Sequence, residues 1–401
     1  MLTLLQINIT ANCGSHGKIA EEIGQLAISY GWQSHIAYGR KAQPSHSHLI
    51  RIGSMWDEYI HGIQSRIMDN HGLASSRATK HLIKTIQFIK PDIIHLHNIH
   101  GYYLNYPLIF QYLAEANIPV VWTLHDCWPI TGHCAHFDSI GCDRWKIGCH
   151  HCPNKSSYPA SLIFDNSKNN YTQKKYYFNL PSQITIVTVS KWQEEIVKDS
   201  FLRNHPTVTI NNGINLDIFK PKKKLISDNK FHILGVASTW NKDKGIDEFV
   251  QLSKIMYYDI TLVGVPEHVR NKLPRQINCI EHTSNVQELV SYYSNADVFV
   301  NPTYNDTYPT VNLEAQACGT PVVTYATGGS PETINSKTGI VVERGNINAL
   351  VEAIESIRAK SPTERESISM LCAQRAQLLF DQKLCFSKYI ELYQKLLNKK
   401  L

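Results

Sequence analysis

The sequence predicts an α/β protein made of two doubly wound, Rossmann-like domains. Strand-like apolar runs alternate with helical stretches, which is typical of parallel sheets covered by helices on both faces. The alternation stops in a polar, irregular stretch at residues 213–229 and then starts again. The chain of 401 residues also exceeds the roughly 250 to 300 residues at which a single hydrophobic core stops growing. We therefore expect one domain over residues 1–213 and a second over residues 230–381.

Each domain is expected to contain several strands joined by helices. In the first domain, the strand candidates are residues 4–9, 93–96, 120–124, 184–189 and 208–211. A helix is expected to begin after Ser190, because this cap residue is followed three positions later by Gln193. In the second domain, the candidates are residues 231–237, 260–263, 279–281, 297–300 and 321–324, with a helix over residues 310–318 that Gly319 ends.

Two acids lie on either side of the start of the helix at residues 310–318. Asp306 lies in the preceding loop, and Glu314 lies about one turn into the helix. The first turn leaves the N–H groups of Thr310, Val311 and Asn312 without partners inside the helix, and the helix dipole adds to their attraction for an anion such as phosphate. A carboxylate below that anion accepts hydrogen bonds from the vicinal hydroxyls of a ribose. The spacing suggests a nucleotide diphosphate site, although an acid at this place also commonly caps a helix.

Two lysines follow the predicted strand at residues 231–237. Lys242 and Lys244 precede a predicted helix, and a lysine at this place can reach a diphosphate. For Lys242, an ordinary solvent-facing role is the competing interpretation.

A glycine-containing loop follows the first strand and opens a helix. Its residues Gly14, Ser15 and Gly17 are candidates to line a ligand, because glycine lets the backbone come close to a bound group. Tight packing of the helix on the strand would explain the glycines equally well.

The segment at residues 306–314, Asp-Thr-Tyr-Pro-Thr-Val-Asn-Leu-Glu, closely resembles the signature of the retaining glycosyltransferases of family 4. The resemblance continues to Ala-Cys-Gly-Thr-Pro-Val-Val at 317–323 and Thr-Gly-Gly-Ser-Pro-Glu at 327–332, and it covers most of the chain. It implies the GT-B architecture, in which two Rossmann-like domains face a cleft. It also implies that a C-terminal helix, here residues 382–401, crosses back to the first domain.

The resemblance assigns roles to individual residues. Glu314 is expected to bind the ribose of the donor, and Asp306 is expected to approach the transferred sugar. Lys244, in its Lys-Gly pair, is expected to bind the donor phosphates, and the loop with Gly14 and Gly17 is expected to border the diphosphate and the acceptor. No catalytic metal is expected, and a UDP- or GDP-sugar is expected as the donor.

The chain departs from the family pattern at several of these places. Many members carry Glu where this chain has Asp306, and Phe-Gly where it has Tyr308 and Pro309. Asp306 is one methylene shorter, so its contact with the sugar is conditional. Many members also carry an arginine at the position of Thr239, and Lys242 is the candidate to replace its charge.

Histidines lie at the ends of two predicted strands, where they are expected to face the cleft. The resemblance points to His125 as the residue that contacts the donor sugar, and Asp126 is expected to orient it or to approach the acceptor. His95 and His97 are expected to point to opposite faces of their strand. At most one of them would then reach the cleft, and His97 is the better candidate.

Five of the ten cysteines lie between Cys127 and Cys152. We expect residues 127–155 to form a polar, loop-like insertion without a hydrophobic core of its own, placed on the acceptor side. Without a secretion signal, clustered cysteines favour metal over disulfides. A tetrahedral zinc site is therefore predicted, and reduced thiols without metal are the alternative. Its expected ligands are Cys134, Cys142, Cys149 and Cys152.

The composition limits the partners of the chain. A net charge of +6 with no nucleic-acid motif argues against a nucleic-acid partner. The excess includes clusters such as Lys174-Lys175 and Lys222-Lys223-Lys224, and it is compatible with peripheral association with an anionic membrane. The start of the chain reads as a strand rather than as a signal peptide, so a cytoplasmic location is expected.

The leading hypothesis is a retaining hexosyltransferase that acts in bacterial surface polysaccharide biosynthesis. Its acceptor would be a glycan or a lipid-linked oligosaccharide, as in the exopolysaccharide and colanic-acid type of enzyme that the segments at 306–314 and 327–332 resemble. A nucleotide-sugar epimerase on the same architecture is one alternative. A non-catalytic, zinc-stapled binding scaffold is the other.

Overall fold

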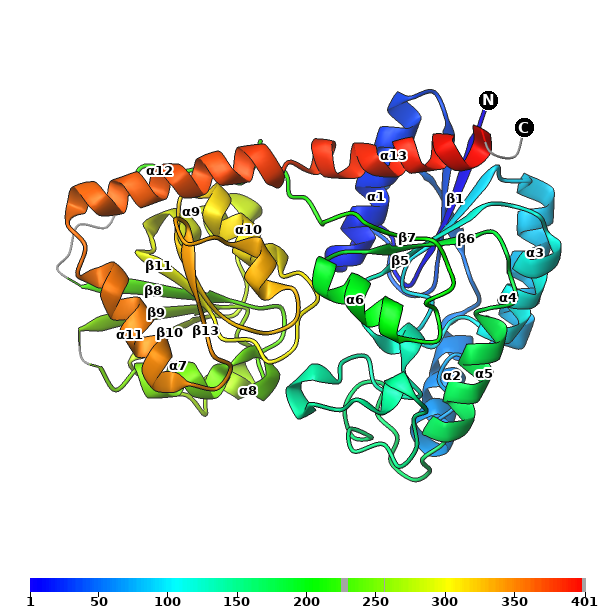
Figure 1. Ribbon diagram of the computed structural model, residues 1–401, viewed down its shortest axis with the longest axis horizontal. Helices are drawn as coiled ribbons and strands as arrows, with labels where there is room; N and C mark the ends of the chain where they lie inside the picture. The colour runs from blue at the N-terminus through cyan, green and yellow to red at the C-terminus, as the bar shows by residue number, and fades with distance from the viewer. Residues whose placement is uncertain (225–229, 256, 399–401) are drawn as a thin grey trace. The chain divides into compact units, whose positions relative to one another are not determined.

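The computed structural model describes residues 1–224, 230–255 and 257–398. The chain divides into two compact units. Unit 1 comprises Met1–Asn211 and the C-terminal residues from Phe386 onward, and unit 2 comprises Asn212–Cys385. Each unit contains a fully parallel sheet, and helices join most of the consecutive strands (Figure 1). The predicted class, two doubly wound α/β sheets, is confirmed.

The sheet of unit 1 has the strand order β3-β2-β1-β4-β5-β6-β7. Its strands are β1 (Thr3–Asn8), β2 (Gln33–Tyr38), β3 (His48–Arg51), β4 (Ile93–Leu96), β5 (Val120–Leu124), β6 (Ile184–Thr188) and β7 (Thr207–Thr209). The helices that join them are α1 (Gly14–Ser29), α2 (Met55–Met68), α3 (Ser76–Ile89), α4 (Tyr106–Glu115), α5 (Ser167–Tyr177) and α6 (Lys191–Asp199). Between β5 and α5 lie the 3-10 helices η1 (Trp128–Ile130), η2 (Asp138–Ile140) and η3 (Arg144–Lys146). Most of α13 (Gln382–Asn398) also belongs to unit 1.

The sheet of unit 2 has the strand order β10-β9-β8-β11-β12-β13. Its strands are β8 (Phe231–Val236), β9 (Tyr258–Val263), β10 (Ile277–Ile280), β11 (Val298–Asn301), β12 (Val322–Tyr325) and β13 (Gly339–Val342). Its helices are η4 (Lys242–Lys244), α7 (Ile246–Leu252), α8 (Glu267–Arg270), α9 (Val286–Asn295), α10 (Thr310–Ala317), η5 (Ser330–Thr333), α11 (Ile347–Arg358) and α12 (Pro362–Leu379).

Central strands of both units are buried along their whole length, which is why they read as continuous apolar runs. They carry the hydrophobic core of unit 1 and the cores of unit 2. The strand order reverses direction between β1 and β4 in unit 1 and between β8 and β11 in unit 2. Ligands of doubly wound sheets bind outside the carboxyl ends of the strands at such switch points. We therefore expect a ligand to bind at the loops that follow these four strands.

No helix in the described parts of the chain is both long enough and apolar enough to cross a membrane.

Candidate functional site

Three elements meet at the switch point of unit 1. The loop after β1 leads into α1, His97 directly follows β4, and His125 directly follows β5. The rings of His97 and His125 stack with centroids 5.3 Å apart, and the ring of His16 in the first turn of α1 lies 5.8 Å from that of His125. The fold thus brings the glycine loop and the predicted sugar-contacting histidine into one site.

A chain of hydrogen bonds fixes the proton position on His125. Gln6 on β1 donates from Nε2 to the carbonyl oxygen of Ala20 (2.7 Å), so its Oε1 is the acceptor for His97 Nε2 (3.0 Å). Neutral His97 then carries its proton on Nε2, and its Nδ1 accepts from Nε2 of His125 at 3.0 Å. Neutral His125 therefore has no proton on Nδ1, which makes that nitrogen an acceptor.

These imidazoles are held in the neutral form. Burial, followed by the neighbouring His97 and His16, lowers the pKa of His125 well below its ordinary value. Burial also lowers the pKa of His16 to about 4. At neutral pH the site in unit 1 thus presents uncharged nitrogen atoms rather than cations, which suits recognition of hydroxyl groups.

The expectation that His95 and His97 face opposite ways is wrong. Residues two positions apart in a strand lie on the same face, and the two rings are 3.9 Å apart. His95 is instead kept in the interior by hydrogen bonds to Thr123 Oγ1 (2.8 Å) and to the hydroxyl of Tyr393 on α13 (2.6 Å). His97 links this interior to His125.

The carboxylate of Asp126 contacts His100 and the backbone that follows it. Its Oδ2 lies 2.8 Å from His100 Nε2, and its Oδ1 accepts from the N–H of Trp128. Burial raises the pKa of Asp126, but His100 outweighs it and holds that pKa below its usual range. Asp126 therefore fixes the start of the segment that follows β5.

The glycine loop places an open helix end beside the histidines. Gly14 adopts a φ of +67°, and Gly14 and Ser15 are exposed at the start of α1. Gly17 is buried, and a Cβ atom there would lie 2.5 Å from Thr10 Oγ1. Gly17 therefore serves the packing of α1, as the competing interpretation held, whereas Gly14 and Ser15 remain available to a ligand.

At the switch point of unit 2, the loops after β8 and β11 are in direct contact. The hydroxyl of Thr303 and the N–H of Tyr304 donate to the carbonyl oxygen of Asp243. Gly245 adopts a φ of +73°, and a Cβ atom there would lie 2.4 Å from the carbonyl oxygen of Pro302. Only glycine permits this approach, and it sets the position of Lys244.

Lys244 and Asp306, which were predicted to bind phosphate and sugar, form an ion pair. Lys244 Nζ donates to Asp306 Oδ2 at 2.9 Å and to the carbonyl oxygen of Asn305 at 3.2 Å. Both side chains keep partial contact with solvent, at 34% and 22% exposure. Lys242 is more exposed than Lys244 and lies at the start of η4. An anion that binds Lys244 would thus compete with Asp306.

Helix α10 begins beside this ion pair. Among the described residues, no side chain caps its N-terminus, and Thr310, Val311 and Glu314 are half-buried. The expectation fails for Asn312, whose N–H donates to the carbonyl oxygen of Pro309. Glu314 Oε2 accepts from the hydroxyl of Tyr293 on α9 at 2.8 Å, and burial, reinforced by Glu314, raises the pKa of Tyr293 well above its ordinary value.

The sequence interpretation missed Gln6, His16 and Tyr293. His16 lies inside the glycine loop already singled out, so its position was visible in the sequence. Gln6 and Tyr293 lie within a strand and a helix, where a single polar side chain carries no signal of what it will contact.

The cysteine-rich segment after β5 is not the polar loop that was expected. Trp128, Phe137 and Trp145 are buried in the core of unit 1. Lys174 on α5 is buried as well, contrary to its expected place in a surface cluster. Its Nζ donates to the carbonyl oxygens of Trp128 (2.7 Å) and Thr131 (3.0 Å), and burial lowers its pKa to about 7.

The predicted zinc ligands lie around one small cavity. Cys134 and Cys152 share a hydrogen bond, and His133 also lines this space. The cavity is lined by all four predicted ligands, Cys134, Cys142, Cys149 and Cys152. Within the described chain, however, no three histidine, cysteine or acidic side chains are arranged to hold a metal ion. Zinc binding therefore stays a prediction.

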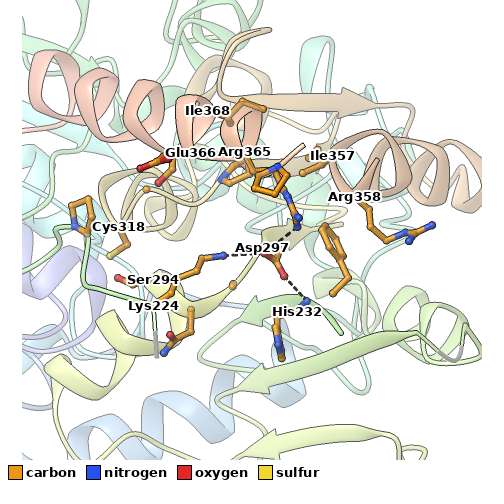
Figure 2. A pocket seen from close by; sticks show the side chains of 18 of the residues that line it. Lys224, His232, Ser294, Asp297, Cys318, Ile357, Arg358, Arg365, Glu366 and Ile368 are labelled. Carbon is orange, nitrogen blue, oxygen red and sulfur yellow. Dashed lines mark hydrogen bonds and ion pairs between the residues drawn. The ribbon is translucent and has the colours of Figure 1, made fainter. Parts of the chain in front are cut away.

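A separate cavity of about 690 Å³ lies at the opposite edge of the sheet of unit 2, near the amino ends of β8 and β11 (Figure 2). Its centre is Asp297, whose Oδ1 accepts from Lys224 at 2.9 Å and lies 3.7 Å from Arg365. Asp297 Oδ2 accepts from the N–H of His232. The predicted site residues lie at the other ends of these strands, so this cavity is distinct from the candidate donor site.

Two family models match the chain. The model of Glycosyltransferase Family 4 matches residues 29–218, and that of Glycosyl transferases group 1 matches residues 230–360. The chain is 25% identical over 429 residues to the putative colanic acid biosynthesis glycosyl transferase WcaC of Escherichia coli, an alignment that covers 98% of this chain and 100% of that protein.

Solved structures share the fold. The sucrose-phosphate synthase of Thermosynechococcus elongatus superposes with a TM-score of 0.75 at 18% identity over 100% of both chains. Anabaena HepE, solved in complex with UDP, superposes with a TM-score of 0.65 at 14% identity over 98% of this chain and 100% of that chain.

The two parallel sheets and the family matches define a glycosyltransferase of the GT-B class. Within that class, the chain belongs to glycosyltransferase family 4.

Proposed function

We propose that this glycosyltransferase moves a hexosyl group from a UDP- or GDP-sugar to a glycan or lipid-linked oligosaccharide during bacterial surface polysaccharide biosynthesis, with retention of anomeric configuration. The similarity to WcaC, whose name places it in colanic acid biosynthesis, supports the setting. The structural likeness to HepE, which was solved with UDP, supports a nucleotide donor.

The observation that carries this proposal is the arrangement around α10. Lys244 follows β8, whereas Asp306 and Glu314 belong to the loop and helix after β11, and all three lie at or beside the switch point of unit 2. Lys244 and the first N–H groups of α10 would hold the diphosphate, and Glu314 would accept from the ribose hydroxyls. When the donor binds, Asp306 would release Lys244 to the diphosphate and would accept a hydrogen bond from a hydroxyl of the transferred sugar instead.

The transfer step needs charge stabilisation rather than a strong base. The oxygen of the acceptor hydroxyl forms a bond to the anomeric carbon, and the bond from that carbon to the diphosphate breaks on the same face. The acceptor proton passes to the departing phosphate, and the nucleoside diphosphate leaves. Lys244 offsets the charge that develops on the leaving group, so the proposal gives no role to a catalytic metal.

His125 would position the donor sugar in this scheme. Its Nδ1 is an acceptor in the neutral form, because His97 and Gln6 fix the proton on Nε2. It would therefore accept from a sugar hydroxyl, and it would stay uncharged at neutral pH.

A donor panel tests the proposal. Calorimetry with UDP, GDP and their hexoses should give binding to one base series, and mass analysis with lipid-linked acceptors should then give an extended glycan. Release of free nucleotide without any acceptor would favour the epimerase. Absence of binding to every nucleotide, by a folded protein, would favour the binding scaffold.

We propose in addition that the four cysteines of the segment after β5 bind a structural zinc ion. The small cavity that they share supports this, since four thiolates form a closed tetrahedral site. Metal analysis of protein purified without a histidine tag should give one zinc per chain. A value near zero in folded, active protein would contradict the proposal.

A further inference from the structure

Helix α2 buries polar side chains and exposes apolar ones. Its buried face carries His61 and Ser65, both at 0% exposure. Its outer face carries apolar side chains, including Trp56 at 73% and Ile60 at 54% exposure. A helix on the surface of a soluble domain usually has the reverse arrangement.

Specific contacts hold the polar face of α2 inward. His61 Nδ1 lies 2.8 Å from Ser75 Oγ, and His61 Nε2 accepts from the N–H of Gly72 at 3.0 Å. Glu58 pairs with Arg40 and Arg51. Rotating the helix to bury its apolar stripe would break these interactions, so the outward direction of the stripe is a fixed property of the fold.

A second exposed apolar segment lies against α2. The N–H of Leu162 donates to the carbonyl oxygen of Arg66 at 2.7 Å, and the N–H of Phe164 donates to that of Ile67 at 3.1 Å. The two segments lie side by side in unit 1 (Figure 1). We call the combined area the apolar surface; it consists of Met55, Trp56, Tyr59, Ile60, Ile63, Ile67, Met68, Leu162, Ile163 and Phe164, all exposed.

Cations border the apolar surface. Arg66 is exposed within α2, and Lys155 Nζ donates to the carbonyl oxygen of Ile163 at 3.1 Å. Arg77 and Ile60 line a common cavity, so Arg77 also lies next to the apolar surface.

The nearby acids are engaged locally. Asp57 caps α2 through Ser54, Glu58 is paired with arginines, and Asp165 accepts from the N–H groups of Cys152 and Ser167. The surface therefore combines apolar side chains with a positive border.

We propose that the apolar surface docks unit 1 onto a lipid bilayer that contains anionic headgroups. Aliphatic side chains would enter the acyl region, Trp56 and Tyr59 suit the interface between headgroups and acyl chains, and the cations would meet lipid phosphates. A two-fold dimer through the same surface is disfavoured, because the nearby acids of the facing copy are already engaged and would not pair with the cations of the border.

This inference goes beyond the proposed function, because binding to vesicles requires neither donor nor acceptor. If both hold, the enzyme would meet a lipid-linked acceptor at the surface where that acceptor resides. Failure of transfer with intact vesicle binding would count against the proposed function alone, and the reverse result would count against this inference alone.

Cosedimentation with vesicles of phosphatidylglycerol and phosphatidylethanolamine tests the proposal. The full chain should bind at low salt, and Ile60→Asp with Ile63→Asp should lower the vesicle partition coefficient at least tenfold. Arg66→Ala with Arg77→Ala should lower it several-fold and weaken its salt dependence. Phe88→Asp on α3 and Leu378→Asp on α12 are matched controls, because both residues are exposed and apolar but lie outside the apolar surface.

Nucleotide binding by calorimetry and circular dichroism should be unchanged in all variants, which separates loss of docking from loss of folding. If the double aspartate variant does not fold, Ile63→Asp alone replaces it, with the same direction expected. The proposal is overturned if the wild-type chain stays in the supernatant, if the aspartate variants bind as well as the controls, or if sedimentation shows a dimer that the aspartates dissociate.

Discussion

The two units arrange their chemistry in opposite ways. Unit 1 keeps neutral imidazoles in its interior, whereas unit 2 keeps charged groups in pairs that reach solvent, as Lys244 and Asp306 do. Unit 2 has three of the nineteen histidines, none of them buried, and unit 1 has the rest. Uncharged acceptors suit hydroxyl groups, and charged pairs suit phosphate, so the contrast matches the proposed division between sugar and diphosphate recognition.

The largest expected effect is on the stability of unit 1 below neutral pH. Burial lowers the pKa of His16 and His61 to about 4 and that of further imidazoles well below the ordinary value; the latter are His71, His95, His97 and His125. As pH falls through about 6.5, these histidines become protonated in the unfolded chain but stay neutral in the folded unit. The free energy of unfolding that unit 1 has above pH 6.5 therefore decreases. A histidine with a folded pKa near 4 destabilises the unit by about 2 kcal/mol between pH 7 and pH 5.

One buried histidine of unit 1, His133, has a raised pKa and therefore opposes this loss of stability at low pH. Burial lowers the pKa of His133, but its bond to Asp69 outweighs burial and raises that pKa overall. Urea unfolding at pH 7 and pH 5, followed by hydroxyl-radical footprinting of each unit, measures the balance. Unit 1 should lose several kcal/mol and unit 2 much less. An equal decrease in the free energy of unfolding of both units would contradict the proposed contrast between them.

The second effect concerns nucleotide binding by unit 2. Glu314→Ala removes a charged acceptor, and hydrogen bonds to charged groups contribute about 1.5 to 3 kcal/mol. Donor affinity should fall about 10- to 100-fold, and transfer should be lost chiefly for that reason.

Calorimetry with the preferred donor gives this value directly. Tyr293→Phe keeps the carboxylate of Glu314 and removes only its 2.8 Å partner, so it should weaken binding less. Glu366→Ala, at the opposite edge of the sheet, should leave binding unchanged. If Glu314→Ala binds the donor with wild-type affinity, Glu314 does not bind the ribose.

The fold was predictable because its signals are repetitive. Central strands buried on both faces need continuous apolar runs, and each run can be recognised in the sequence without knowledge of the others. Strands β2, β3 and β13 are only partly buried, offer no such run and were missed.

Single candidate residues were predictable from local motifs, but the pairing of residues that are distant in sequence was not. The loop containing Asp306 and the helix containing Glu314 form one local motif, so the sequence alone singles out both acids as candidates. The bond between Lys244 and Asp306 spans 62 positions, and that between His97 and Gln6 spans 91. Pairing at such distances depends on which strands lie side by side, and no local pattern encodes it.

A third test addresses the imidazoles of unit 1. His125→Ala should lower kcat about 100-fold, a typical effect of losing a positioned catalytic group, while donor affinity changes little. Gln6→Leu should lower kcat less, because it removes the acceptor that fixes the protons on His97 and His125 but leaves both rings. Steady-state kinetics with calorimetry separates the two parameters. An equal loss of donor affinity in His125→Ala would place that residue in nucleotide binding instead.

The smallest expected effect separates the partners in the ion pair of unit 2. Lys244→Met should raise the donor KM about tenfold, because one charge-assisted contact to phosphate is lost. Asp306→Asn should lower kcat by a similar factor with little change in KM if Asp306 accepts from the transferred sugar. Because the pair is partly exposed, its own coupling should be below about 1 kcal/mol in a double-mutant cycle. If Asp306→Asn instead lowers the donor KM and leaves kcat intact, the acid acts only as a competitor of phosphate for Lys244. The shorter side chain of Asp306 would then hold the lysine in place between turnovers, and the sugar would be held by unit 1 alone.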